Sequence, residues 1–315
     1  MNKKFILIIF LGIICNSCLA QNADNDSVDN NFAEIKITAP YVPQKVEFAG
    51  VEYDLSRNDL RERLDRELVN MQYLHASTIL NLKRANRYFP EIEPILKQEK
   101  IHSDFKYLAL IESNLNPASQ SPAGATGLWQ FMESSAKEYG LTVNANIDER
   151  LNIEKSTIAA CRFIKDLYAS FGNWTSVAAA YNAGKNRISK ELEKQGEKSA
   201  LDLWLNTETS RYFFRILAAK IIFSDPQKYG FYLTPEQLYP PVKYKKIEVD
   251  YEILDLAEFA KQHKINYLQL KSANLWLRDR FLENKKSVKF TILIPKEESL
   301  NYNPEKTKDH NEICK

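Results

Sequence analysis

A helical period in the apolar residues runs through most of the chain and restricts its fold class more than any other feature. From Ser56 to about Phe223, apolar side chains recur every three or four residues, as in Leu60, Leu64 and Leu68. Only 12 prolines and 9 glycines occur among 315 residues, so collagen-like and linker-dominated proteins are excluded. Turn signals divide the stretch at Pro90, Pro117, Gly124, Gly140, Gly172 and Gly184. The pattern predicts a mainly α domain of short helices over residues 55–230.

The pattern changes after the pair Pro240-Pro241. Residues 242–249 alternate as a strand does, residues 252–263 and 267–276 have a helical period, and residues 288–294 are apolar and β-branched. This order predicts a small α+β module, β-α-α-β, over residues 240–296. The remaining residues, 297–315, are polar and are expected to form a loose tail.

The first twenty residues have the composition of a bacterial export signal. Lys3 and Lys4 precede an apolar run of ten residues, which is about half of the 20 that a membrane-spanning helix needs. Cleavage after Ala20 is one expectation, and acylation of Cys18 as the first residue of an outer-membrane lipoprotein is the other. Residues 21–54 begin with a segment rich in Asn and Asp and are predicted to form a tether.

The charge balance argues against nucleic acid as a partner. The chain has 43 basic and 41 acidic residues, and loss of Lys3 and Lys4 with the export signal leaves the two signs equal. Proteins that bind nucleic acid normally carry a basic excess.

Metal and disulfide chemistry have little support in the sequence. The four histidines are scattered without ligand spacing, so no metal site is expected. Outside the export signal only Cys161 and Cys314 remain, and a single disulfide between them is the one pairing that the sequence allows.

One acidic residue falls on the apolar face of a predicted helix that starts near Ser103-Asp104. At 100° per residue, Glu112 lies within the arc that Phe105, Leu108 and Leu115 define. A carboxyl group in apolar surroundings has a raised pKa, as a general acid for glycoside cleavage requires. The alternative is a glutamate at the rim of the core, paired with Lys or Arg.

Four sequence blocks follow one another around this glutamate. They are Glu112-Ser113-Asn114-Leu115-Asn116-Pro117, residues 121–132 (SPAGATGLWQFM), residues 178–184 (AAAYNAG) and Glu208-Thr209-Ser210-Arg211-Tyr212. In this order and at these spacings they resemble the lytic transglycosylases of the lysozyme-like superfamily, in particular the membrane-bound type D. The resemblance covers roughly residues 55–230 and implies a lysozyme-like helical domain.

The resemblance implies a reaction on peptidoglycan that uses one carboxyl group and no cofactor. Glu112 would protonate the bond between N-acetylmuramic acid and N-acetylglucosamine, the substrate acetamide would stabilise the cationic centre, and Glu112 would then accept the C6 hydroxyl proton to give a 1,6-anhydro product. Tyr181 would donate a hydrogen bond to Glu112 and orient it. Substrate would contact Ser113, Trp129, Gln130, Tyr181, Asn182 and Glu208. Such a protein would act in the periplasm.

Several of these residues have simpler interpretations. Phe131 fits core packing as well as sugar contact, Tyr181 fits a half-buried core tyrosine, and Glu208 fits a helix cap or an ion pair with Arg211. A hydrolytic muramidase would need a second carboxylate, and Glu133, Asp148 and Glu149 are the nearest acids in sequence. A wall-binding protein without catalysis is the third alternative.

The C-terminal module resembles a divergent LysM domain, a small fold that binds glycans containing N-acetylglucosamine. Residues 256–260, 270–274 and 292–295 follow the pattern of that family. Asp250-Tyr251-Glu252 lacks the usual Gly-Asp entry, and Asn284-Lys285-Lys286 replaces the usual Pro-Gly. The resemblance implies the fold of this module more directly than glycan binding.

Overall fold

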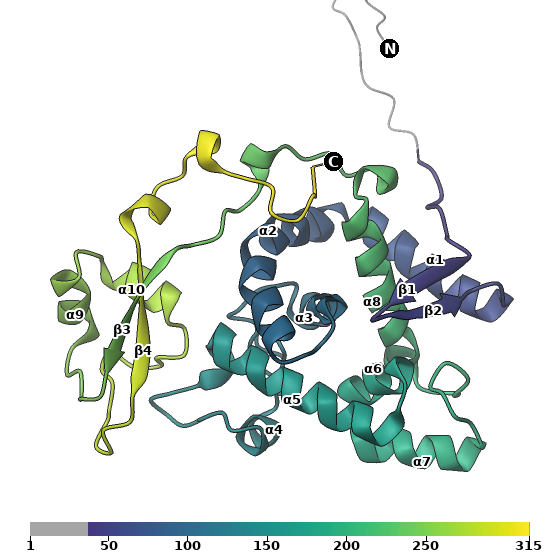
Figure 1. Ribbon diagram of the computed structural model, residues 1–315, viewed down its shortest axis with the longest axis horizontal. Coiled ribbons are helices and arrows are strands. Elements are labelled where there is room, and N and C mark those ends of the chain that lie inside the picture. Colours follow the sequence, from purple (N-terminus) through teal and green to yellow (C-terminus); the bar gives the residue numbers. More distant parts are fainter. Residues whose placement is uncertain (1–36, 315) are drawn as a thin grey trace, which may run out of the picture. The chain divides into compact units, whose positions relative to one another are not determined.

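The computed structural model describes residues 37–314, and the predicted export signal with its Cys18 lies outside this range. Helices dominate residues 58–224 (Figure 1). The α-helices of this region are α1 (Asn58–Tyr73), α2 (His75–Gln98), α3 (Lys106–Ser113), α4 (Glu133–Glu138), α5 (Ile153–Phe171), α6 (Trp174–Ala183), α7 (Lys185–Gln195) and α8 (Thr207–Ser224). The mainly α fold class is therefore confirmed.

The helical core forms where α1 and α6 pack on α8, α2 and α6 pack on α5, and α3 packs on α8. Its largest fully buried side chains include Trp129, Tyr212, Phe89 and Phe105. The segment Ala178–Ala180 is almost completely buried, because small side chains let α6 approach its neighbours closely. These contacts bring the C-terminal turn of α3 next to α6 and α8.

Helix α2 continues through Pro90 and Pro94, although Pro90 was expected to mark a turn. A proline inside a helix removes a backbone hydrogen bond and crowds the preceding turn. Here Phe89, Ile92 and Leu96 on both sides of the prolines are buried in the core, and this tertiary packing outweighs the local preference.

The folded region begins before residue 55, so the predicted tether is too long. Strands β1 (Lys45–Phe48) and β2 (Val51–Asp54) form an antiparallel hairpin. Phe48 at its tip is fully buried and makes edge-to-face contacts with Phe105 and Phe213. The hairpin therefore belongs to the helical core because one aromatic side chain anchors it there.

The C-terminal module has the predicted order. It consists of β3 (Tyr244–Val249), α9 (Leu256–Gln262), α10 (Tyr267–Ala273) and β4 (Phe290–Pro295), with β3 and β4 antiparallel (Figure 1). Its own core contains Ile292 and Leu270, and Ile147 from the helical domain joins that core. The module is therefore packed against the loop that precedes α5.

The last residues are more ordered than a loose tail. Ile313 is buried in the core of the helical domain. Asn86 on α2 donates to the carbonyl of Lys308 at 3.0 Å and accepts from the backbone N–H of His310 at 2.7 Å. A buried asparagine and one apolar anchor thus fix a segment whose polar composition indicated disorder. In residues 37–314 no helix is long and apolar enough to cross a membrane.

Candidate active site

Glu112 lies in the last turn of α3 and its side chain is half-buried. The helix ends at Asn114 and the chain then turns through Leu115, both with left-handed backbone (φ 52° and 51°). This conformation is unfavourable for leucine, and the full burial of Leu115 maintains it. Asn81 donates to Asn114 Oδ1 at 3.0 Å, so a second helix fixes the same turn. The position of Glu112 is thus held by packing on both sides.

The surroundings of Glu112 favour its protonated form. Burial, together with the smaller effect of the nearby Glu208 carboxylate, raises the pKa of Glu112 to about 7. A hydrogen bond from Tyr212 and the guanidinium of Arg215 act in the opposite direction. A carboxyl group with a pKa near neutrality exchanges a proton readily at that pH, which is what general acid and base catalysis requires.

Tyr212, rather than the expected Tyr181, is the tyrosine that contacts this carboxyl group. The hydroxyl group of Tyr212 donates to Glu112 Oε1 in a short hydrogen bond. The hydroxyl group of Tyr181 donates instead to the backbone carbonyl of Trp129 at 2.9 Å. The prediction that Tyr181 bonds directly to Glu112 is therefore wrong. Spacing on α8 was the available signal, because Glu208, Tyr212 and Arg215 fall on one helical face.

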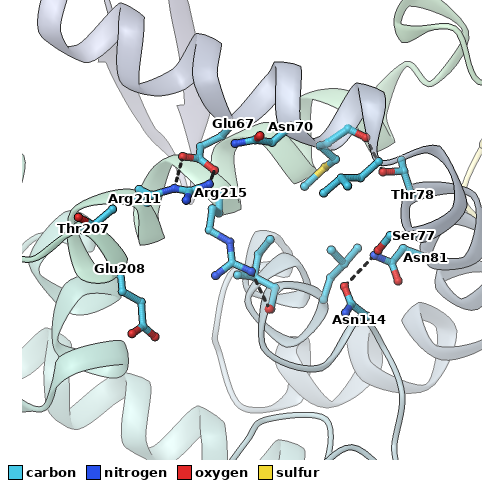
Figure 2. A pocket seen from close by; sticks show the side chains of 14 residues that line it. Glu67, Asn70, Ser77, Thr78, Asn81, Asn114, Thr207, Glu208, Arg211 and Arg215 are labelled. Atoms are coloured by element: carbon cyan, nitrogen blue, oxygen red, sulfur yellow. Dashed lines mark hydrogen bonds and ion pairs between the residues drawn. The ribbon is translucent and has the colours of Figure 1, made fainter. Parts of the chain in front are cut away.

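A cavity of about 530 Å³ opens between α1, α2, α3 and α8 (Figure 2). Glu112 itself is not among the residues that line it, whereas Glu208 and Arg215, whose charges act on Glu112, are. Ile111 and Arg215 lie in its wall, and Arg215 donates to the carbonyl of Ile111 at 3.3 Å. The residues that line it are Glu67, Asn70, Met71, Leu74, Ser77, Thr78, Asn81, Leu110, Ile111, Asn114, Thr207, Glu208, Arg211 and Arg215. Its amides, hydroxyl groups and charges suit a polar ligand with many hydroxyl and amide groups.

Two features of this cavity were not expected from the sequence. Glu67 accepts two hydrogen bonds from Arg211, at 2.7 and 2.9 Å, so a bidentate ion pair forms one wall. The buried Oδ1 atom of Asn81 lines the cavity without a hydrogen-bond partner in the described residues. It is an acceptor available to a ligand, and neither Glu67 nor Asn81 belongs to the four sequence blocks.

Asn182 and Glu208 lie together. Asn182 Nδ2 donates to Glu208 Oε1 at 3.2 Å, and its Oδ1 accepts from Thr209 at 2.8 Å. Glu208 is exposed and lines the cavity. The alternative that Glu208 pairs with Arg211 is wrong, because Arg211 pairs with Glu67.

Three residues expected to contact substrate have their polar groups engaged elsewhere. Trp129 is fully buried and its indole N–H donates to Thr157 at 2.9 Å, so it presents no face to a sugar. Ser113 is buried and donates to the carbonyl of Ala109. Gln130 donates to the carbonyls of Gly127 at 2.8 Å and Ser119 at 3.2 Å. These side chains fix the structure of the site, and Phe131 is also a core residue.

The loop that contains Gly127 packs closely against the backbone of Arg150. Gly127 has φ +85°, and a Cβ atom there would lie 2.1 Å from the carbonyl oxygen of Arg150. The Arg150 side chain is buried and donates to the carbonyls of Gly124 and Phe131. Glycine is therefore required at residue 127 by both conformation and space.

The acids considered for a hydrolytic mechanism all have other partners. Asp148 accepts two hydrogen bonds from Arg150, at 2.9 and 2.8 Å. Glu149 is buried and contacts Lys155, while Glu133 is exposed and pairs with Lys137. The acid whose charge acts on Glu112 is Glu208, which is not one of these three.

A cluster of possible metal ligands lies elsewhere. Atoms of Glu47, His102 and Asp104 approach within 4.8 Å of one another. The ammonium group of Lys220 contacts Glu47 at 2.8 Å and Asp104 at 2.6 Å, so the cluster already holds a cation. Cys161 and Cys314 are both free thiols, and no disulfide joins them.

Family comparisons match both parts of the chain. Residues 91–203 match the family model described as "Transglycosylase SLT domain". Residues 245–298 match "Soluble lytic transglycosylase C-terminal LysM-like domain". The LysM-like fold predicted for the module is thereby confirmed.

Individual proteins that are similar to this chain are also described as lytic transglycosylases. Membrane-bound lytic murein transglycosylase D from Escherichia coli is 32% identical over 56% of this chain and 39% of its own length. Membrane-bound lytic murein transglycosylase F from Salmonella typhi is 30% identical over 33% of this chain and 22% of its own. The 70 kDa soluble lytic transglycosylase from E. coli superposes with a TM-score of 0.38 at 20% identity, over 52% of this chain and 30% of that one. The chain thus spans about two fifths of the type D relative.

Proposed function

We propose, from the premise that this chain belongs to the SLT transglycosylase family, that it is a peptidoglycan lytic transglycosylase with Glu112 as its acid and base. The observation that carries the proposal is the half-buried Glu112, whose pKa is raised to about 7 and which interacts with Glu208 and Arg215 in the wall of a polar cavity. Relatives described as lytic murein transglycosylases support the same substrate class.

The first step is protonation of the glycosidic oxygen between N-acetylmuramic acid and N-acetylglucosamine. Tyr212 donates to Oε1 of Glu112, which leaves Oε2 to carry the proton that is transferred. As the C–O bond breaks, positive charge develops at the anomeric carbon. The substrate's own acetamide stabilises that charge, so no protein carboxylate is required as a nucleophile.

In the second step Glu112, now a carboxylate, accepts the proton of the C6 hydroxyl group. The C6 oxygen bonds to the anomeric carbon and closes the 1,6-anhydro ring. No water is consumed, and Glu112 returns to its protonated state. The hydrogen bond from Tyr212 and the charge of Arg215 stabilise the carboxylate between the two steps.

The test is mass spectrometry of soluble fragments released from purified sacculi. We expect muropeptides lighter by one water than the hydrolytic product, and we expect none with Glu112→Gln. Hydrolytic products would identify a muramidase instead. A folded protein that binds sacculi and releases nothing would be a wall-binding protein, and either result would refute the proposal.

This function requires the protein to reach the cell wall, so we also infer export to the periplasm. Residues 1–20 and Cys18 lie outside the described residues, and both processing alternatives stay open. The intact mass of the protein recovered from a bacterial host distinguishes them. Cleavage after Ala20 leaves Gln21 first, whereas acylation leaves a heavier, lipid-bearing Cys18.

A further inference from the structure

A second cavity lies where the LysM-like module meets the helical domain. Its volume is about 360 Å³, within the range of small-molecule sites. Helix α2 contributes Tyr88 and Glu91, the segment before and at the start of α5 contributes residues 151–154, and the module contributes Lys246 and Trp276. It is separate from the cavity between α1, α2, α3 and α8, with which it shares no lining residue.

The strand residues that line this cavity come from one face of the β3–β4 sheet. Tyr244, Lys246, Thr291 and Leu293 line it, whereas the intervening Ile292 faces the module's own core. The cavity is therefore formed by the sheet face that the module turns toward the helical domain. Apolar and aromatic side chains make up most of its wall.

Two residues that line this cavity each carry a buried polar atom without a hydrogen-bond partner among residues 37–314. The two atoms are Oε1 of Glu91 and the indole Nε1 of Trp276. In residues 37–314, only two other buried side-chain nitrogen or oxygen atoms lack a hydrogen-bond partner, Gln72 Oε1 and Asn81 Oδ1. Leaving a buried polar group without a hydrogen bond destabilises a protein, so two such groups in the lining of one cavity call for an explanation.

The two atoms differ in hydrogen-bonding chemistry. The indole N–H of Trp276 is a donor only, and the side chain, 2% exposed, is stacked on Phe290 with ring centroids 5.6 Å apart. Burial raises the pKa of Glu91 to about 7, with Arg87 opposing, so its carboxyl group both accepts and donates near neutral pH. A ligand that satisfies both must combine an acceptor with a polar N–H or O–H.

The junction that forms the cavity is fixed by backbone hydrogen bonds. The N–H of Asp148 donates to the carbonyl of Trp276 at 2.9 Å, and Arg278 donates to the carbonyl of Asn146 at 2.9 Å. At the cavity, Lys246 pairs with Glu154 at 2.8 Å, and both side chains are well exposed. Because the walls are held together without a ligand, little ordering is required when one binds.

We propose that this cavity binds an amide-bearing fragment of peptidoglycan, whose carbonyl accepts from Trp276 Nε1 and whose N–H donates to Glu91. This inference rests on the proposed function for the identity of the polymer. Two parts of peptidoglycan carry secondary amides, the N-acetyl group of its sugars and the peptide stem. The apolar wall fits an acetyl methyl or alanine methyl group, and exposed Lys246 fits a carboxylate of the stem.

The test follows the indole N–H resonance of Trp276 in the full chain carrying Glu112→Gln, so that no probe is consumed. Trp276→Phe identifies the resonance by its loss. Diacetylchitobiose and a free stem tetrapeptide are titrated separately to millimolar concentration. We expect the resonance to shift with at least one probe, and the probe that acts identifies the source of the amide. No shift with either probe would overturn the proposal.

Binding of the active probe is then compared among carboxyl variants by calorimetry. We expect Glu91→Gln to weaken binding about three- to tenfold, the effect of one hydrogen bond. Glu93→Gln is the matched control, because Glu93 is on the same helix but pairs with Lys106 and does not line the cavity. Equal affinities in the two variants would refute the role of Glu91. Release of anhydro products by the unmodified chain is measured separately, so failure of this proposal is distinguishable from failure of the proposed function.

Discussion

Glu112 and Glu91 are two half-buried glutamates in neighbouring helices, and burial raises the pKa of each to about 7. Their partners differ. Glu112 accepts a hydrogen bond from Tyr212 and lies near the charges of Arg215 and Glu208. Glu91 has one oxygen without a partner, and Arg87 is the nearby charge that acts on it.

The comparison shows that a raised pKa does not by itself identify a catalytic residue. Desolvation is the largest cause of the raised pKa at both positions. The two sites differ in the groups that stabilise the carboxylate form of the glutamate, which is the form present between the two steps of catalysis. Glu112 has a hydroxyl donor and a guanidinium in place for its carboxylate, and Glu91 lacks the hydroxyl donor. We therefore assign proton transfer to Glu112 and ligand binding to Glu91.

The largest expected difference is in turnover. Glu112→Gln should reduce release of anhydromuropeptides from sacculi by about 10² to 10⁴, the usual contribution of a general acid and base. Glu91→Gln should leave the rate within about threefold. Initial rates from liquid chromatography of the released fragments give both values. Similar losses of turnover in the two variants would contradict the proposal that Glu112 transfers the proton and Glu91 does not.

Glu112 and Glu91 should contribute similarly to the pH dependence of the free energy of unfolding. Each glutamate has an ordinary pKa of 4.5 that rises to about 7 on folding, so the folded protein binds more protons than the unfolded chain between these pH values. The free energy of unfolding must therefore fall as pH rises from about 4.5 to 7. We expect about 1 kcal/mol from each, less than the full shift would give, because both side chains are partly exposed.

Urea unfolding at pH 5 and pH 7.5 measures this decrease. It should be smaller in Glu112→Gln and in Glu91→Gln by comparable amounts, whereas the exposed Glu133→Gln serves as the control. A decrease that neither variant changes would show that the two carboxyl groups are not protonated in the folded protein at neutral pH.

Tyr212→Phe should affect only the Glu112 site. The hydrogen bond from Tyr212 lowers the pKa of Glu112, so its loss raises that pKa. The fall in rate on the alkaline side of the pH profile should therefore move to higher pH, with turnover reduced about tenfold. Tyr181→Phe is the control, since its hydroxyl group donates to a backbone carbonyl. If Tyr181→Phe shifted the alkaline side of the pH–rate profile and Tyr212→Phe did not, Tyr181 rather than Tyr212 would be the tyrosine that acts on Glu112.

The smallest expected effect is that of Glu208→Gln. This change should shift the alkaline side of the pH–rate profile in the direction opposite to that expected for Tyr212→Phe. The negative charge of Glu208 raises the pKa of Glu112, so its removal lowers that pKa. The alkaline fall should move to lower pH, with a rate change of a few-fold at neutral pH. A pH profile identical to that of the unmodified chain would show that Glu208 exerts no charge effect on Glu112.

The sequence by itself predicted most of the helices, the order of the C-terminal module and the apolar helix face that carries Glu112. Helical spacing placed Glu112 on an apolar face, and the alternation in residues 242–249 indicated a strand, because both periods follow from local backbone geometry. The four motif blocks indicated a resemblance to lytic transglycosylases, and residues 91–203 match the SLT transglycosylase family model. The order β-α-α-β indicated a LysM-like module, and residues 245–298 match a LysM-like family model.

Only the tertiary structure decided which side chains meet. Tyr212 is 100 residues from Glu112, and no local period relates them. Trp129 and Gln130 occupy motif positions, yet packing against Thr157 and the loop carbonyls engages their polar groups. The same holds for Phe48, which brings a segment of polar character into the core. Local patterns fix elements and their faces, whereas contacts between distant segments depend on how those faces pack, and the cavity between Glu91 and Trp276 exists only through such packing.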